Sequence, residues 1–353
     1  MKGSIIMARK YTLTEESCIV RGKTLYRIKA EKDFGDVKKG DLGGFIETEA
    51  NLSHIGKAWV YDNAKVFDNA QVYDNACIYN DACIRHSACV FREAKVYDNA
   101  IVHDGARVYG NAQVRNRASI YNDARVSGEA RIYDNADIFG NANVFGSADI
   151  YENARIYGNA VIYDDVDIYD RAEVYGDAWI SGNARIADNA RVYGDTRVFG
   201  NAYIFESASV FGKAIVYGDA RVGELASVQY SQLKTDLRED LKASLRCQCN
   251  LIPENDKVIA YKVVNKNLSS LCDKNFIYKI GKVAVCENPA ENNASCAAGL
   301  HFSNLTYWDN EATERLDNLI YLKAEIDLKD IITIQNGKIR CRRAKILSKI
   351  DIF

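Results

Sequence analysis

The stretch KVFDNAQVYDNACIYNDA, residues 65–82, repeats one six-residue word three times: an aliphatic residue, an aromatic residue, two turn-forming residues, an alanine and one variable residue. Every sixth residue from Val60 to Val228 is valine or isoleucine, at all 29 positions. Two residues before each of these, alanine occupies 27 of the 29 positions, and Val166 and Thr196 are the exceptions. The residue after the aliphatic one is tyrosine or phenylalanine in 21 words. The repeat therefore covers half of the chain without an insertion.

A six-residue period does not fit a helix, because 3.6 residues per turn cannot keep one face constant over such words. It fits a short strand followed by a corner, since alanine and the aliphatic residue then share one side of the strand. Asn, Asp and Gly suit the corners because they tolerate left-handed backbone angles. Three strands and three corners close a triangular coil of 18 residues. We therefore expect a parallel solenoid of about ten coils at a spacing of roughly 4.8 Å, with aliphatic side chains inside and aromatic ones outside.

The repeat resembles the hexapeptide-repeat family, and the stretches TLYRIKAEKDFGDVKKGDLGGFIETEANLS (residues 24–53) and GKAWVYDNA (residues 56–64) resemble members from bacteriophages and prophages. The resemblance implies a left-handed parallel β-helix and a homo-oligomer, with a trimer favoured. We expect an N-terminal β cap over residues 1–55 and the β-helix over residues 56–230.

Composition excludes several classes of protein. The 353 residues include 46 basic and 48 acidic ones, so the net charge of −2 gives no general attraction for nucleic acid or an anionic membrane. No apolar run is long enough for a membrane span, and the first residues lack a secretory signal. The ten cysteines show no CxxC pair, so we expect reduced thiols, a cytoplasmic protein (in the bacterial host, by the phage resemblance) and no cofactor.

Many hexapeptide-repeat proteins are acyltransferases, and two histidines of this chain are candidates for the base that such an activity requires. In those relatives a histidine acts as general base at a subunit interface. The candidates here are His86, at a corner, and His103, at an aromatic position. We expect both to face solvent without an orienting carboxylate, so they are weak catalytic candidates. We expect no metal site at Cys77, Cys83 and Cys89, because a six-residue spacing puts these exposed thiols on three faces of one coil.

The aromatic residues that follow the aliphatic ones lie 18 apart and should stack in ladders along the coils. One predicted ladder holds Tyr61, Tyr79, Tyr97, Tyr133, Tyr151 and Tyr169, with Arg115 interrupting it, and another holds Tyr121, Phe139, Tyr157, Tyr175, Tyr193 and Phe211. Such ladders stabilise neighbouring coils, and as exposed apolar stripes they are also candidate contacts between subunits.

The repeat fades after Val228. Leucines spaced by four residues predict an amphipathic helix over residues 231–247, part of a cap or linker at residues 231–252. Residues 253–353 predict a small α+β domain. Its expected strands are 257–264, 276–285, 319–326, 331–335 and 338–347, with a helix at 310–316 and a hairpin turn at Asn336-Gly337. This layout is similar to an uncharacterised domain that is appended to phage and bacterial repeat proteins, on the segments GLHF (residues 299–302) and KIRCRRAKIL (residues 338–347).

Two groups of residues in this domain are candidate sites. Cys296 and His301 could form a nucleophile and base, although a structural role is the alternative. The basic series Lys338, Arg340, Arg342, Arg343 and Lys345 could bind an anion, with Tyr261 or Tyr278 stacking on a base; a solvated edge strand is the alternative.

We therefore expect a mainly β, two-domain, oligomeric phage protein that binds a ligand without catalysis and sequesters a nucleotide-like host immune signal. The alternatives are an acyltransferase that uses acetyl-CoA and a structural scaffold that binds a host protein. We expect nucleic acid and membranes not to be partners.

Overall fold

The computed structural model describes residues 9–223, 226–229, 232–234, 240–290, 298–311, 319–335 and 337–350. The chain divides into two compact units, residues 1–204 and 205–353. Within the described residues, no helix is both long and apolar enough to cross a bilayer.

The first unit begins with antiparallel strands that lead into the solenoid. Strand β1 (Tyr11–Val20) pairs with β2 (Lys23–Ala30), β2 pairs with β3 (Leu42–Ile46), and a short 3-10 turn, η1 (Glu49–Asn51), follows. Strand β3 then pairs in parallel with β5 (Lys65–Val66), so the N-terminal strands extend one face of the solenoid. Trp59 is buried in the first coil and packs edge-on against Tyr11 and Phe34.

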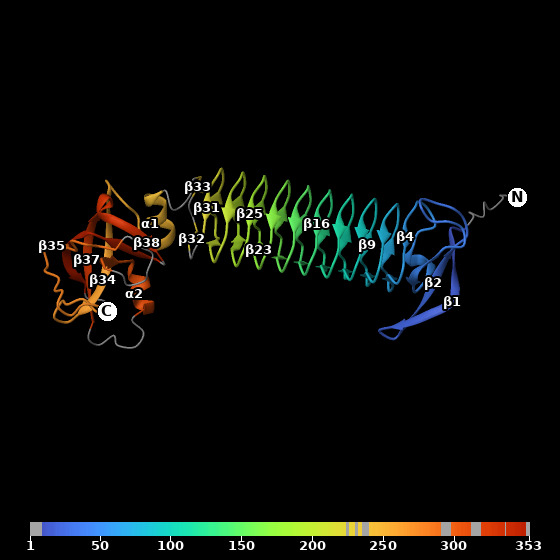
Figure 1. Cartoon of the computed structure of the whole chain (residues 1–353), viewed down its shortest axis with the longest axis horizontal. Helices are drawn as coiled ribbons and strands as arrows, with labels where there is room; N and C mark the ends of the chain where they lie inside the picture. The colour runs from blue at the N-terminus through green and yellow to red at the C-terminus, as the bar shows by residue number, and fades with distance from the viewer. Residues whose placement is uncertain are drawn as a thin grey trace. The chain divides into compact units, whose positions relative to one another are not determined.

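The repeat forms the parallel solenoid that its period predicts. Two-residue strands recur every six residues from β4 (Trp59–Val60) to β28 (Tyr203–Ile204), and only β23 (Glu173–Gly176) and β26 (Arg191–Gly194) are longer. Each strand pairs with the third strand after it, 18 residues later, as in the register of β10 (Lys95–Val96) with β7 (Cys77–Ile78). The stacked coils are seen in Figure 1 between the labels β4 and β25. The same strands continue in the second unit through β29 (Ser209–Val210), β30 (Ile215–Val216), β31 (Arg221–Val222), β32 (Ser227–Val228) and β33 (Gln232–Leu233), which gives about ten coils.

The core of the solenoid contains the two residue types that the repeat keeps constant. The valine or isoleucine of each word and the alanine two residues before it are at most 1% exposed, while the residue between them is partly or fully exposed in every word after the first, where Trp59 is buried. The prediction that the aliphatic side chains meet inside the coil is therefore confirmed. Small and β-branched residues fill this narrow interior.

The corners adopt the left-handed backbone that their composition predicts. Asp98, Asn116 and Asp134 are stacked 18 apart with φ between +56° and +59°. The Asp98 carboxylate accepts a hydrogen bond from the backbone N–H of Asn116, and Asp134 serves Glu152 in the same way. A short acidic corner residue thus satisfies a backbone donor of the next coil that the two-residue strands leave unpaired.

The aromatic ladders are present and lie outside the core. Tyr61 stacks on Tyr79 at 4.4 Å between ring centroids, and Tyr133, Tyr151 and Tyr169 stack at 4.9 and 5.1 Å. Tyr121, Phe139, Tyr157, Tyr175 and Tyr193 form the second ladder at 4.7 to 4.9 Å. Arg115 joins the later part of the first ladder, because its guanidinium lies 4.5 Å from the centre of the Tyr133 ring.

The second unit contains the C-terminal domain. Its larger antiparallel sheet has the order β34 (Lys257–Asn265), β37 (Leu319–Asp327), β40 (Arg343–Ile350) and β35 (Val283–Val285). A smaller sheet has the order β36 (Leu300–Phe302), β39 (Lys338–Cys341) and β38 (Ile331–Gln335). Helices α1 (Leu241–Cys249) and α2 (Leu305–Glu311) and the 3-10 turn η3 (Leu328–Asp330) complete the domain, and Leu245 and Cys249 of α1 lie in its core.

Several predicted boundaries in this unit are wrong. The helix expected at 231–247 begins only at Leu241, because Gln232 and Leu233 form a strand of the last coil; residues 235–239 lie outside the described part. The strand expected at 276–285 is interrupted by a turn at Gly281, with φ +76°, and only Val283–Val285 is a strand. The helix expected at 310–316 begins at Leu305, and residues 312–318 are not described. The expected hairpin at Gly337 is present between β38 and β39.

Candidate functional site

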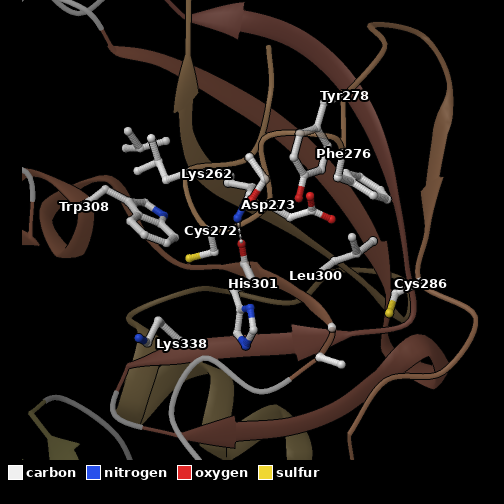
Figure 2. Close-up of a pocket in the computed structure, with 15 residues that line it drawn as sticks. Lys262, Cys272, Asp273, Phe276, Tyr278, Cys286, Leu300, His301, Trp308 and Lys338 are labelled. Carbon is white, nitrogen blue, oxygen red and sulfur yellow. Dashed lines mark hydrogen bonds between the residues drawn. The ribbon is translucent and has the colours of Figure 1, made fainter.

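A pocket of about 550 Å³ opens in the C-terminal domain beside β34, β36 and the segment 270–278 (Figure 2). Its walls combine aromatic rings with cationic side chains. The residues that line it are Lys262, Val263, Ser270, Leu271, Cys272, Asp273, Phe276, Tyr278, Cys286, Ala298, Gly299, Leu300, His301, Trp308 and Lys338.

Lys262 is the buried cation of this pocket, at 7% exposure. Alternation along β34 places it on the same face as Ala260 and Val264, which are buried in the domain core. Its ammonium donates to the backbone carbonyl of His301 at 3.2 Å. Its Nζ also lies 5.6 to 5.9 Å from the ring centres of Tyr278, Phe302 and Trp308. These contacts compensate part of the cost of burying the charge.

His301 and Arg340 face each other across the paired strands β36 and β39. The Nε of Arg340 donates to Nε2 of His301 at 3.3 Å, and its Nη1 donates to the carbonyl of Ala290 at 3.1 Å. Burial lowers the pKa of His301 to about 4, with further lowering from Lys262 and Arg340. Because an arginine can only donate, Nε2 is the acceptor and the imidazole is neutral at physiological pH.

Gly299 makes room for this arginine. A Cβ at Gly299 would come within 2.5 Å of the Cγ of Arg340, and the glycine has φ +152°. Arg340 is 3% exposed, so its stem passes directly beneath the strand that carries His301. The glycine of the GLHF segment is therefore required by close packing.

Helix α2 places Trp308 at the wall of the pocket. Asn304 precedes the helix, and its side-chain oxygen accepts from the backbone N–H of Tyr307 at 2.7 Å. Its side-chain amide donates to the carbonyl of Cys249, the last residue of α1. The indole N–H of Trp308 donates to the carbonyl of Tyr261 at 2.7 Å. The ring is thereby fixed with one face available to the pocket (Figure 2).

The basic C-terminal series is not one site. Lys338, His301 and Tyr278 line the pocket, whereas Arg340 lies beneath it. Tyr261 lines a second depression, of about 600 Å³, on the other face of β34. Arg342, Arg343 and Lys345 are exposed and line neither pocket, so the series is not gathered in one cavity, and its role as an exposed anion-binding edge stays a prediction. Cys296, the proposed partner of His301, lies outside the described residues. Sequence reasoning missed Lys262 and Trp308.

On the solenoid, His86 is exposed and His103 is largely covered, and both are close to Asp104. The expectation that no carboxylate orients them is therefore wrong. His86 and Asp104 are 18 residues apart, so the stacking rule itself contained the signal. Cys77, Cys83 and Cys89 lie in three different sheets, as expected, but they are partly buried and not exposed. Burial raises the pKa of the Cys83 and Cys89 thiols.

A family match is found for the C-terminal domain. Residues 258–352 match the model of a family described as a domain of unknown function, DUF7666. No curated protein matches the chain. The matched range runs from the second residue of β34 through β40 and contains every residue that lines the pocket.

Proposed function

We propose that the C-terminal domain binds a small anionic ligand with an aromatic ring, of the nucleotide type, and holds it without converting it. The observation that carries this proposal is the pocket whose lining combines the rings of Trp308 and Tyr278 with the cationic side chains of Lys262 and Lys338. A volume of about 550 Å³ is in the range of small-molecule sites.

The lining divides into parts with different chemistry. Trp308 and Phe276 offer apolar ring surface for a base, as aromatic side chains do in nucleotide recognition. Lys338 offers a cation for a phosphate, and the buried charge of Lys262 adds a positive field in a region of low dielectric. Asp273, which is exposed, is the acidic group of the lining and can accept from the amino group of a base.

Binding without conversion is supported by the state of His301. Its Nε2 lone pair accepts from Arg340, and a pKa of about 4 makes it a weak base at neutral pH. The imidazole therefore serves as a neutral wall of the pocket. Together with the phage resemblance of the repeat, this supports sequestration of a nucleotide-like immune signal by an oligomer, with a trimer favoured.

The test is calorimetric titration of the full chain with mono-, di- and cyclic nucleotides. We expect a member of this panel to bind, and Trp308→Ala or Lys338→Ala to weaken it about tenfold or more, as for the loss of a stacking or charge-assisted contact. Lys345→Ala is the matched control, because it removes a cation of the same C-terminal segment outside the pocket. A panel that does not bind, or binding that depends on Lys345 and not on Lys338, would contradict the proposal.

One observation favours the acyltransferase alternative. Asp104 accepts from Nδ1 of His86 at 2.7 Å, an arrangement in which a carboxylate orients an imidazole base. Turnover of acetyl-CoA that is lost in both His86→Ala and His103→Ala would establish this function. A thermal-shift assay in which acetyl-CoA has no effect would argue against it.

A further inference from the structure

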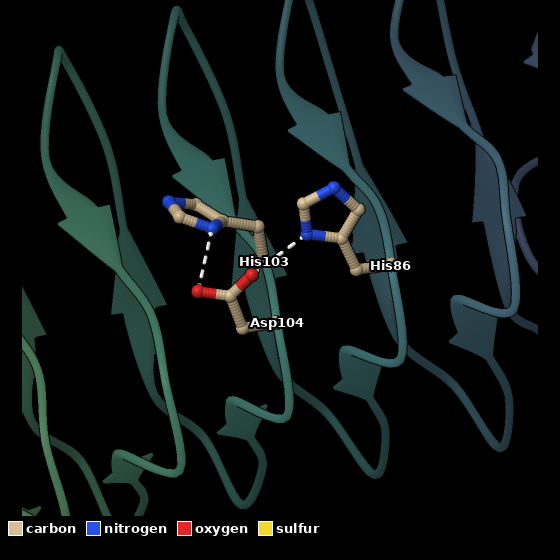
Figure 3. A group of neighbouring side chains, drawn as sticks. All are labelled: His86, His103 and Asp104. Carbon is tan, nitrogen blue, oxygen red and sulfur yellow. Dashed lines mark hydrogen bonds and ion pairs between the residues drawn. The ribbon is translucent and has the colours of Figure 1, made fainter.

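Three side chains of the solenoid converge at one point on its surface (Figure 3). The Nδ1 atom of His86 lies 2.7 Å from one carboxylate oxygen of Asp104, and the Nδ1 atom of His103 lies 3.2 Å from the other. These ligand atoms all lie within 4.8 Å of one another. The two histidines thus point the same ring nitrogen at a shared carboxylate.

The coil geometry fixes this arrangement. His86 and Asp104 occupy the same corner of successive coils, with φ of +58° and +56°. His103 takes the place of an aromatic residue, and its ring stacks flat on Tyr121 at 5.0 Å with an angle of 1° between the planes. The stacked ring cannot turn away without losing this contact. The three side chains are therefore placed by the repeat itself, from two neighbouring coils.

The hydrogen bonds of the cluster are incomplete. The Nδ1 atom of His103 is buried and has no hydrogen-bond partner, because its approach to Asp104 lacks the angle of a hydrogen bond. Like other corner carboxylates, Asp104 accepts from the backbone N–H of the next coil, at 3.4 Å from Asn122, and it also accepts from the side-chain amide of Asn122 at 3.4 Å. Its approaches to the two imidazoles, at 2.7 and 3.2 Å, are shorter. The carboxylate is thus directed mainly at the two imidazoles.

We propose that His86, His103 and Asp104 bind one divalent transition-metal ion, with zinc as the best match, through the two Nδ1 atoms and a carboxylate oxygen. Two imidazoles and a carboxylate are a ligand set that zinc uses where positions stay open to water or a further ligand. Bonds of about 2.0–2.2 Å in tetrahedral geometry separate ligand atoms by roughly 3.3 Å. The separation of 3.2 Å at His103 is close to this value, and the separation of 2.7 Å at His86 would widen by a rotation of the exposed His86 ring.

The charged side chains around His86 should raise or lower the affinity of the cluster for a metal ion. A metal on Nδ1 places the proton of His86 on Nε2, and the negative charge of Asp68, whose carboxylate lies 4.0 Å from Nε2, favours that proton electrostatically. The guanidinium of Arg85 lies 3.2 Å from the same Nε2 and opposes both this proton and the cation. Removing the charge of Arg85 should therefore strengthen metal binding.

The test uses the full chain, freed of metal and titrated with Co²⁺ by visible absorption and then with Zn²⁺ by competition. We expect one ion per chain at this site, and about a tenfold or larger loss of affinity in His86→Asn, His103→Tyr and Asp104→Asn. Asparagine already occupies equivalent corners at Asn116 and Asn122, and tyrosine is common at the His103 position, so these variants should fold. Circular dichroism checks that they do.

Two further variants complete the design. Asp98→Asn is the matched control, because it changes a corner carboxylate outside the cluster and should leave the affinity unchanged. Arg85→Gln should raise the affinity for the metal, because it removes a positive charge beside His86. The proposal is overturned if the wild-type chain binds neither ion, or if the three cluster variants bind as tightly as the wild type. Intense near-ultraviolet bands of cobalt–thiolate bonds that persist in those variants would assign the metal to the cysteines instead.

Discussion

Thr196 occupies a position where 27 of the 29 words carry alanine, and its side chain is fully buried. Its hydroxyl has no hydrogen-bond partner in the described structure. An unsatisfied buried hydroxyl costs about 1–3 kcal/mol. We predict that Thr196→Val, which keeps the shape and removes the hydroxyl, raises the free energy of unfolding by roughly 1 kcal/mol.

The reverse change provides the control. Val166 occupies the equivalent position of another coil and is also fully buried. Val166→Thr should lower stability by a similar amount, measured as the midpoint of urea unfolding followed by far-ultraviolet circular dichroism. If the two substitutions shift the midpoint in the same direction, the buried hydroxyl is not the cause.

A second residue-scale prediction concerns acid. The pKa of His301 is about 4 in the folded domain, against an ordinary value of 6.5. Between these pH values the unfolded chain binds more protons at His301 than the folded domain does. The free energy of unfolding is therefore unaffected by the titration of His301 above about pH 6.5, falls as the pH falls below it, and has lost the full contribution of the neutral imidazole once the pH is below 4. We expect His301→Gln, whose amide oxygen can still accept from Arg340, to lose less stability between pH 7 and pH 5 than the wild type.

Amide hydrogen exchange of β36 and β39 measures this effect where it arises. The wild-type and variant chains are compared at each pH, so that the intrinsic exchange rate cancels. An equal loss of protection in both chains would show that His301 is not held in its neutral form.

At the scale of elements, the solenoid was predictable because the residue types within each six-residue word determine which positions are buried and which form the corner. Alanine and valine or isoleucine mark the interior, and Asp, Asn and Gly mark the corners, so local sequence and packing agree at every step. The C-terminal strands were predictable only in part. Apolar runs continue through the turn at Gly281, and sheet pairing, not local preference, ends β39 before Arg342.

The candidate site illustrates the same limit. Alternation along β34 places Lys262 on the face of Val258, Ala260 and Val264, and this signal was available in the sequence. The partners that make it a site come from β36, α2 and the segment 270–278, which only tertiary structure brings together. Arg343 shows the converse, because its charge in a basic run predicted a role, but its strand directs it to solvent.

The aromatic ladders lead to a prediction at this scale. Tyr157 stacks on Phe139 at 4.8 Å and on Tyr175 at 4.7 Å. Each aromatic pair contributes about 0.5–1.5 kcal/mol, so Tyr157→Ala should destabilise the solenoid by roughly 1–3 kcal/mol. Tyr157→Phe keeps both rings in place and should be nearly neutral. Thermal unfolding measures both variants, and an equal loss in the phenylalanine variant would show that the hydroxyl matters more than the stack.

At the scale of the whole molecule, the solenoid and the C-terminal domain each have a core of their own. The solenoid buries the constant positions of its repeat, and the C-terminal domain buries a separate cluster around Phe302, Leu322 and Ile346. The proposed ligand pocket is made by residues 262–338 of a single chain. The ladders, if they mediate contacts between copies, belong to a different part of the molecule. Oligomerisation and ligand binding are then separate properties.

This separation predicts the stoichiometry of the complex. If each pocket acts alone, native mass spectrometry of the assembled protein should find as many bound ligands as chains, three in a trimer. Lys338→Ala should remove the ligands and leave the assembly unchanged, because Lys338 lies in the pocket and not on a ladder. One ligand per assembly would instead place the site at the contact between subunits, where residues of several chains are needed to complete it.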